Sequence, residues 1–82
     1  MPEITRFFGI IIRMFVNDHE PSHIHCIYGE KESVFDLKNM QFTDNNLSPR
    51  AQKMVIEWAD KYRYQLLEMW FTKQIRKLPP LE

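Results

Sequence analysis

The three histidines of the chain lie within seven positions, in the polar segment over residues 18–25. His23 and His25 are two positions apart in a run of strand-forming residues, so we expect both imidazoles to project from one face of a β-sheet. His19 and Asp18 precede that run, in a connection that a proline stiffens. These four side chains are the candidate functional site.

One chemistry open to this cluster is metal-free proton transfer. Histidine gains and loses a proton near neutral pH, and a neighbouring arginine can stabilise the charge that develops on a phosphate. If Ile24 shares the apolar face of the sheet with Ile12, strand alternation brings Arg13 to the histidine face. Such a site suits RNA cleavage, because the attacking 2′-hydroxyl belongs to the substrate. The catalytic candidates on this interpretation are His23, His25, His19, Arg13, Arg6 and Asp18.

Metal binding is the second interpretation. His23 and His25 would be ligands from one strand face, and His19 or Asp18 would be a third ligand, which leaves an open position for water. Imidazole suits several divalent metals, zinc among them, so the spacing alone does not select the ion.

The third interpretation is structural. The histidines would hydrogen-bond the connection between two strands and brace its turn, with Asp18 orienting one imidazole. The protein would then be a non-catalytic binding or regulatory protein that uses no cofactor.

A small antiparallel sheet is predicted to position the cluster. Residues 4–8 and 10–16 are rich in β-branched and aromatic side chains, with Gly9 as a bulge or bend between them. One face of that first stretch is wholly apolar, at Ile10, Ile12, Met14 and Val16. Polar turns separate further strands expected over 23–28, 32–37 and 40–43. The pattern predicts an antiparallel meander of three to four strands.

One long helix is predicted to cover the apolar face of this sheet. Ser48 and Pro49 are typical of a helix start, as N-cap and first helical residue. Apolar residues then recur at intervals of four and three, at Ala51, Val55, Trp58, Tyr62, Leu66 and Met69. We therefore expect a single α+β domain over residues 1–82, with strands within about 4–43, a helix over about 49–73 and a short C-terminal tail.

A second apolar row occupies nearly the opposite side of that helix, at Tyr64, Leu67, Phe71, Ile75 and Leu78. One small sheet cannot bury both rows, so we expect the second to bind a partner, either a second copy of the chain or a small cognate protein. The alternative is that the chain bends near residues 70–72 and tucks the row onto its own sheet.

Composition and charge limit the partners. Eleven basic and eleven acidic residues give a formal net charge of +0, so no global charge draws the protein to nucleic acid or to an anionic membrane. The aliphatic run Ile10 to Ile12 ends at Arg13, far short of the roughly 20 apolar residues of a membrane span. Because Cys26 is the single cysteine, it forms no internal disulfide, and we expect a reducing, cytoplasmic location without membrane association.

Several motifs resemble the small bacterial domain-of-unknown-function family four-one-six-zero: Arg6-Phe7-Phe8-Gly9-Ile10, Asp18-His19-x-Pro21-x-His23-x-His25, Tyr28-Gly29 and Glu57-Trp58-Ala59. The central motif resembles the family's Asp-His-x-Pro-Pro-His-x-His, and departs from it by Ser22 at the second proline and by Ile24 where an aromatic is usual. Members of the family tend to be encoded beside another small protein, a pairing like that of toxin–antitoxin modules. The resemblance therefore implies one half of a two-protein module, with some members proposed as toxins, and it identifies no substrate. Together with the histidine and arginine cluster it favours a toxin component acting on RNA or translation, and a non-catalytic, antitoxin-like binding or regulatory protein is the alternative.

Overall fold

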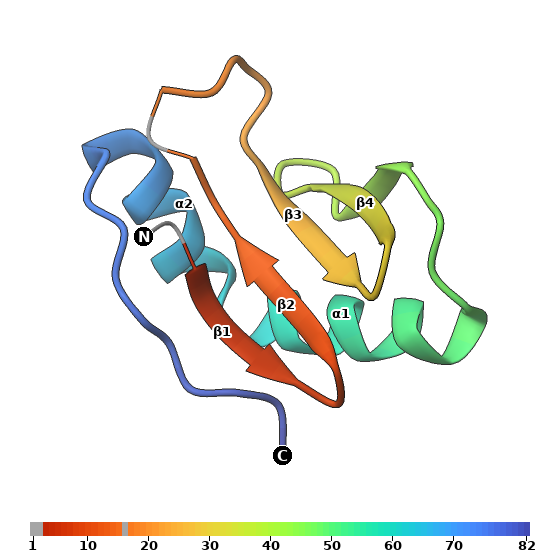
Figure 1. Ribbon diagram of the computed structural model, residues 1–82. Helices are drawn as coiled ribbons and strands as arrows, with labels where there is room; N and C mark the ends of the chain where they lie inside the picture. The colour runs from red at the N-terminus through yellow and green to blue at the C-terminus, as the bar shows by residue number, and fades with distance from the viewer. Residues whose placement is uncertain (1–2, 16) are drawn as a thin grey trace.

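Five strands form one antiparallel sheet in the computed structural model, which describes residues 3–15 and 17–82 (Figure 1). They are β1 (Glu3–Phe7), β2 (Ile10–Arg13), β3 (His23–Tyr28), β4 (Lys31–Asp36) and β5 (Gln41–Asp44). Each strand pairs with the next along the chain, so the predicted α+β class with an antiparallel meander is confirmed. The predicted number of three to four strands is wrong, because the first stretch of β structure forms a hairpin of two strands.

The tip of this hairpin accounts for the additional strand. Phe8 and Gly9 both have positive φ, 49° and 82°, as in the two-residue type I′ turns that join paired strands. A side chain at the second position would clash, because a Cβ there would lie 2.8 Å from Cε1 of Tyr28. Gly9 therefore reverses the chain in a tight turn, which is sharper than the bulge or bend expected from the sequence. Val16, expected on the apolar face of the first stretch, lies outside the described residues.

Two helices, α1 (Pro49–Lys61) and α2 (Arg63–Thr72), cover one face of the sheet (Figure 1). α1 begins as predicted, because the Ser48 side chain accepts a hydrogen bond from the backbone N–H of Ala51 and Pro49 opens the helix. Burying large apolar side chains between the two layers is the main source of stability in such a fold. The fully buried ones include Ile4, Ile10, Ile12, Met14, Ile24, Phe35, Leu37, Val55, Trp58, Leu66 and Met69.

The prediction of one helix over about 49–73 is wrong, because the backbone kinks at Tyr62, where φ is −109° and ψ is 20°. Hydrogen bonds from the N–H of Tyr62 to Trp58 and from the N–H of Leu66 to Tyr62 continue across the junction. The kink is thus a change of direction within a nearly continuous ladder. No helix in the described part of the chain is long and apolar enough to cross a membrane.

The C-terminal tail turns away from α2 and runs back along the edge of the sheet (Figure 1). Lys73 ends the helix in the left-handed conformation, with φ of 60°. Farther on, the backbone N–H of Leu78 donates to the carbonyl of Ile4 on β1, at 3.1 Å. The indole N–H of Trp58 donates to the carbonyl of Pro79, at 2.8 Å. These two bonds fix the tail against β1 and α1.

The second apolar row does not form one exposed face, which corrects the expectation from the sequence. Ile75 and Leu78 lie in the tail and pack against the core, and Leu67 is half-buried against it. Tyr64 and Phe71 remain exposed on α2, at 83% and 72%. The alternative expectation, a bend that tucks the row onto the sheet, therefore applies to Ile75 and Leu78. The bend lies directly after α2, which ends at Thr72.

Candidate functional site

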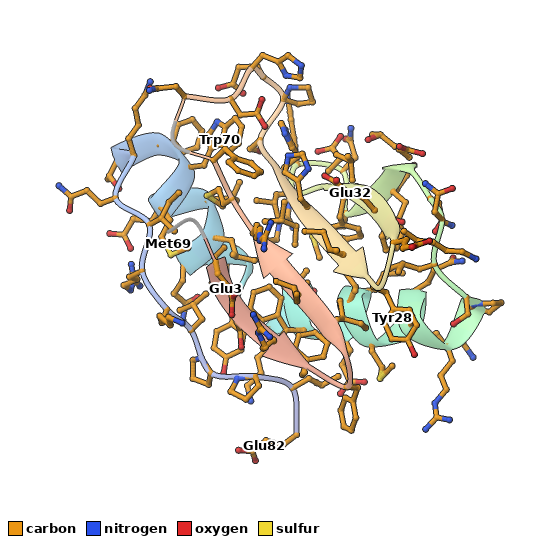
Figure 2. All side chains as sticks on the ribbon, viewed as in Figure 1. Glu3, Tyr28, Glu32, Met69, Trp70 and Glu82 are labelled. Carbon is orange, nitrogen blue, oxygen red and sulfur yellow. The ribbon has the colours of Figure 1, made fainter. Side chains whose placement is uncertain are left out.

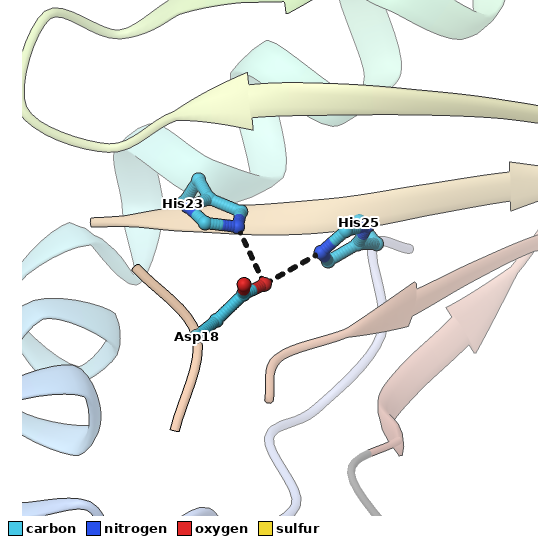
Figure 3. A group of neighbouring side chains, drawn as sticks. All are labelled: Asp18, His23 and His25. Carbon is cyan, nitrogen blue, oxygen red and sulfur yellow. Dashed lines mark hydrogen bonds and ion pairs between the residues drawn. The ribbon is translucent and has the colours of Figure 1, made fainter. Parts of the chain in front are cut away.

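β3 and the connection before it bring three of the candidate site residues together. His23 and His25 project from one face of β3, as strand parity predicts, and Asp18 reaches between them from the β2–β3 connection (Figure 3). In the sheet, His25 pairs with Arg13 on β2 and with Val34 on β4. The rigid centre of the sheet thus carries the two histidines, and a connection carries the carboxylate.

A single oxygen joins the three side chains. The Nε2 atom of His23 lies 2.8 Å from Oδ2 of Asp18, and the Nε2 atom of His25 lies 3.1 Å from the same oxygen (Figure 3). The side chains are 7%, 16% and 25% exposed for His23, His25 and Asp18 respectively. The cluster is therefore shielded, but a small ligand can reach it.

The other nitrogen of each ring is also anchored. Nδ1 of His23 donates to the backbone carbonyl of Pro21 at 2.7 Å, and Nδ1 of His25 lies 2.6 Å from Oε2 of Glu32. Both partners are oxygens that accept, as does Oδ2 of Asp18. The full set of hydrogen bonds therefore forms only when each ring carries a proton on both nitrogens. With Nδ1 held in this way, each Nε2 atom is directed at Asp18.

The carboxyl group of Asp18 is held in its ionised form. Burial alone would raise its pKa, but hydrogen bonds from His25, from His23 and from the backbone N–H of His19 outweigh burial and lower the pKa from 3.8 to about 2. An ionised carboxylate is the form that accepts hydrogen bonds on both oxygens and the form that binds metal ions.

Aromatic rings enclose the two imidazoles. The ring of Phe15 lies edge-on to His25, with centroids 4.9 Å apart, and the Trp70 ring lies against His23, with centroids 5.0 Å apart. Trp70 comes from the end of α2, and its indole N–H donates to Oε2 of Glu20 at 2.9 Å. Trp70, on α2, contacts His23, and Glu32, on β4, contacts His25; Figure 2 labels both residues. The site is therefore supported by both layers of the fold.

A cavity of about 330 Å³ opens beside the cluster, and its walls are formed by Asp18, His19, Pro21, His23, His25, Val34, Asp36 and Thr43. His19 lines this cavity but stands apart from the cluster: its side chain is 87% exposed and its Nδ1 lies 3.9 Å from Oδ1 of Asp18. His19 is thus placed where it can contact a ligand in the cavity, not where it shares the central oxygen.

The two candidate arginines are placed differently. Arg13 pairs with His25 across β2 and β3, but it is not among the described residues that line the cavity. Arg6 lies on β1, two strands from His25, and its guanidinium makes hydrogen bonds of 3.0 and 2.9 Å to the carboxylate of Glu3. The structure therefore makes Arg13 the backbone neighbour of His25 in the sheet, and it keeps the guanidinium of Arg6 on Glu3, away from the cluster.

Three contributors to the site escaped the sequence reasoning: the carbonyl of Pro21, the carboxylate of Glu32 and the ring of Trp70. For Glu32 a signal existed, because the turn at Gly29 pairs it with Ile27, which lies on the histidine face two residues from His25. Trp70 flanks the apolar side of the helix, a position that predicts burial in the core. No local pattern predicts its contact with His23 on β3.

The donor set is suited to a divalent metal. In the described residues, Asp18, His23 and His25 are the group of three whose ligand atoms all lie within 4.8 Å of one another. Ligands about 2.1 Å from a metal, at angles of about 90–109°, lie roughly 3.0–3.4 Å apart. The two nitrogen–oxygen separations here, 2.8 and 3.1 Å, are near that range, and all three ligand atoms lie within 4.8 Å of one another. Histidines that bind metals also donate their second N–H to a carbonyl or carboxylate, as both do here.

Comparison with known proteins gives one match. A family model described as "Domain of unknown function (DUF4160)" matches residues 9–71, a span that contains Asp18, His23, His25 and Glu32 and excludes Arg6. No curated protein and no solved structure matches the chain significantly.

Proposed function

The chain belongs to the DUF4160 family, a family of unknown function, and we propose that it is a metal-binding domain in which Asp18, His23 and His25 hold a divalent transition-metal ion. One observation carries this proposal. Both Nε2 atoms converge on the same carboxylate oxygen, at 2.8 and 3.1 Å, while both Nδ1 atoms are anchored outside the cluster.

Metal binding explains this geometry better than a brace for the connection does. Without a metal, the four contacts of the two rings, whose centroids lie 5.1 Å apart, need a donated proton at every ring nitrogen, because all the partners are acceptor oxygens. A divalent ion replaces the two Nε2 protons and keeps both Nδ1 bonds intact. A structural brace could use either nitrogen of each ring, whereas a metal site needs both Nε2 atoms to face one point.

Two histidines and one carboxylate would leave coordination positions open toward the cavity. Such a donor set suits several first-row metals, with zinc and ferrous iron among them, and supplies Lewis-acid chemistry to a water or substrate oxygen bound there. His19, on the cavity wall, is available for hydrogen bonding to that ligand.

The test is metal binding by the full chain purified without a histidine tag. We expect one ion per chain when the protein is loaded with Zn²⁺ or Co²⁺, by elemental analysis and calorimetry, and a visible Co²⁺ absorption band. Asp18→Asn and His25→Gln each remove one ligand and should weaken binding by about 100-fold or more. His19→Ala is the matched control, because it removes an exposed histidine of the same cavity and should leave affinity unchanged.

Two results would contradict the metal proposal. One is a folded wild-type chain, with native circular dichroism, that takes up no stoichiometric metal. The other is equal loss of binding in His19→Ala and His25→Gln, which would indicate adventitious binding to surface histidines.

A second candidate function is a toxin component of a toxin–antitoxin-type module, acting on RNA or translation in the cytoplasm through a metal-free histidine and arginine site. What supports it is the pairing of Arg13 with His25 and the exposed His19 on the cavity wall. Expression of the chain in a bacterium should then arrest growth, and His25→Ala or Arg13→Ala should relieve the arrest. RNA cleavage that persists in excess chelator favours this candidate over the metal centre. Harmless expression favours an antitoxin-like binding protein with structural histidines.

A further inference from the structure

A second cavity lies between the β2–β3 connection, the β4–β5 turn and α2. It has a volume of about 540 Å³, and we call it the α2 groove; its lining residues are Glu20, Pro21, Ser22, Lys38, Arg63, Leu67 and Phe71. It is separate from the histidine cavity, although Pro21 lines both. A volume of this size accommodates several side chains of a bound segment.

The apolar part of the groove is contributed by α2. Phe71 is 72% exposed, and Leu67, one helical turn earlier, is half-buried against the core. A large aromatic side chain left in water next to a concave surface is typical of an anchor point for a partner.

The polar part of the groove is cationic. The Nη2 of Arg63 donates to the backbone carbonyl of Lys38 at 3.1 Å, which holds the guanidinium at the rim. Its Nε is buried and has no hydrogen-bond partner among the described residues. Within the part of the chain that the structure describes, neither Lys38 nor Arg63 forms an ion pair. The acidic residue of the groove, Glu20, already accepts the indole N–H of Trp70.

We propose that the α2 groove binds a protein segment in which an acidic side chain stands beside an apolar one. The apolar side chain would pack on Phe71 and Leu67, and the carboxylate would pair with Lys38 and Arg63. Charge complementarity favours an acidic occupant, because the two cations of the groove, neither in an ion pair among the described residues, outnumber its one carboxylate. Nucleic acid fits less well, since phosphate binding draws its affinity from many cations and this chain has a net charge of +0.

The test selects ligands from a random library of 12-residue peptides displayed on phage, with the full wild-type chain as the bait. Enriched peptides should share an acidic residue next to an apolar or aromatic one. Their affinity, measured on synthetic peptides by fluorescence anisotropy, should fall at least about tenfold in Phe71→Glu and in Lys38→Glu. Raising the salt concentration should weaken the same peptides.

Matched controls separate the groove from other exposed side chains. Tyr64→Ser removes the other exposed aromatic residue of α2, and Lys53→Glu reverses an exposed charge on α1; neither residue lines the groove. Both should retain wild-type affinity, and all four variants should retain the wild-type circular dichroism spectrum.

Several outcomes would overturn the proposal. These are the absence of enriched peptides, enrichment of sequences without acidic residues, and binding that survives Phe71→Glu. Two further results would assign the groove to another occupant and so also overturn it. One is tight binding of a 12-nucleotide single-stranded RNA that the same variants abolish, and the other is self-association in light scattering that Phe71→Glu abolishes.

Discussion

The indole N–H of Trp70 donates a hydrogen bond to Oε2 of Glu20, at 2.9 Å and across 50 positions of the chain. This bond ties the end of α2 to the connection that carries Asp18. The Trp70 ring also lies against His23, with ring centroids 5.0 Å apart. The position of the carboxylate in the candidate site therefore depends on the packing of α2.

Replacing Glu20 by alanine should lower the free energy of unfolding by about 1 kcal/mol, because the buried indole N–H loses its acceptor. Glu20→Gln keeps an acceptor oxygen and should lose less. Urea unfolding followed by fluorescence measures both. A Glu20→Ala variant as stable as the wild type, with unchanged metal affinity, would show that this bond does not order the connection.

Glu32→Ala should weaken metal binding by about 10- to 100-fold, because Nδ1 of His25 loses the carboxylate that orients the ring. The Glu32 side chain is 54% exposed, so stability should hardly change. Glu30→Ala removes the same charge two residues away, from an exposed turn position, and should bind metal as the wild type does. Calorimetric titration with Zn²⁺ compares the three proteins, and equal affinities would argue against a positioning role for Glu32.

The metal-free protein should lose stability in acid through Asp18. Its pKa is about 2 in the folded chain and 3.8 ordinarily, so the folded state binds this proton less tightly than the unfolded state does. The stabilisation is complete above about pH 4 and disappears as the pH falls toward 2, by roughly 1–2 kcal/mol after solvent screening. Urea unfolding between pH 2 and 5 should show this slope in the wild type and a shallower one in Asp18→Asn.

Cys26 should resist alkylation in the folded protein. The thiol is fully buried, and burial, with a contribution from the negative charge of Glu32, raises its pKa to about 12. The reactive thiolate is therefore scarce at pH 8. Iodoacetamide labelling followed by mass spectrometry should be orders of magnitude slower than in the same protein unfolded in urea. Comparable rates would mean that β3 opens readily.

Local patterns predict the part of the site that lies on one strand. His23 and His25 share a face because their spacing matches the period of a strand, and Asp18 precedes them closely enough to reach both. Ser48 and Pro49 likewise predict the start of α1 from local chemistry alone. These features depend on residues that are neighbours in the sequence, so the sequence is sufficient to predict them.

Other features depend on tertiary contacts or on weak local signals. Tyr62 interrupts the helix without a proline or glycine, the residues that usually mark a kink. Phe8 adopts a positive φ, which is uncommon for residues other than glycine. Its residue type therefore predicts a continuing strand at the position where the chain turns. Trp70 reaches His23 and Glu20 only after α2 has packed on the sheet. Such positions follow from the assembled fold, which local periodicity does not describe.

The hydrogen bond from Leu78 to Ile4 bears on how the protein behaves at high concentration. β1 is an edge strand, and the free backbone groups of an edge can recruit strands of other molecules into aggregates. The tail occupies part of that edge, and Pro79 and Pro80 then present no N–H groups with which the sheet could extend further. If the tail were removed, the backbone groups of β1 would be free to pair with strands of other molecules. The solubility of the protein would then fall before its fold was lost.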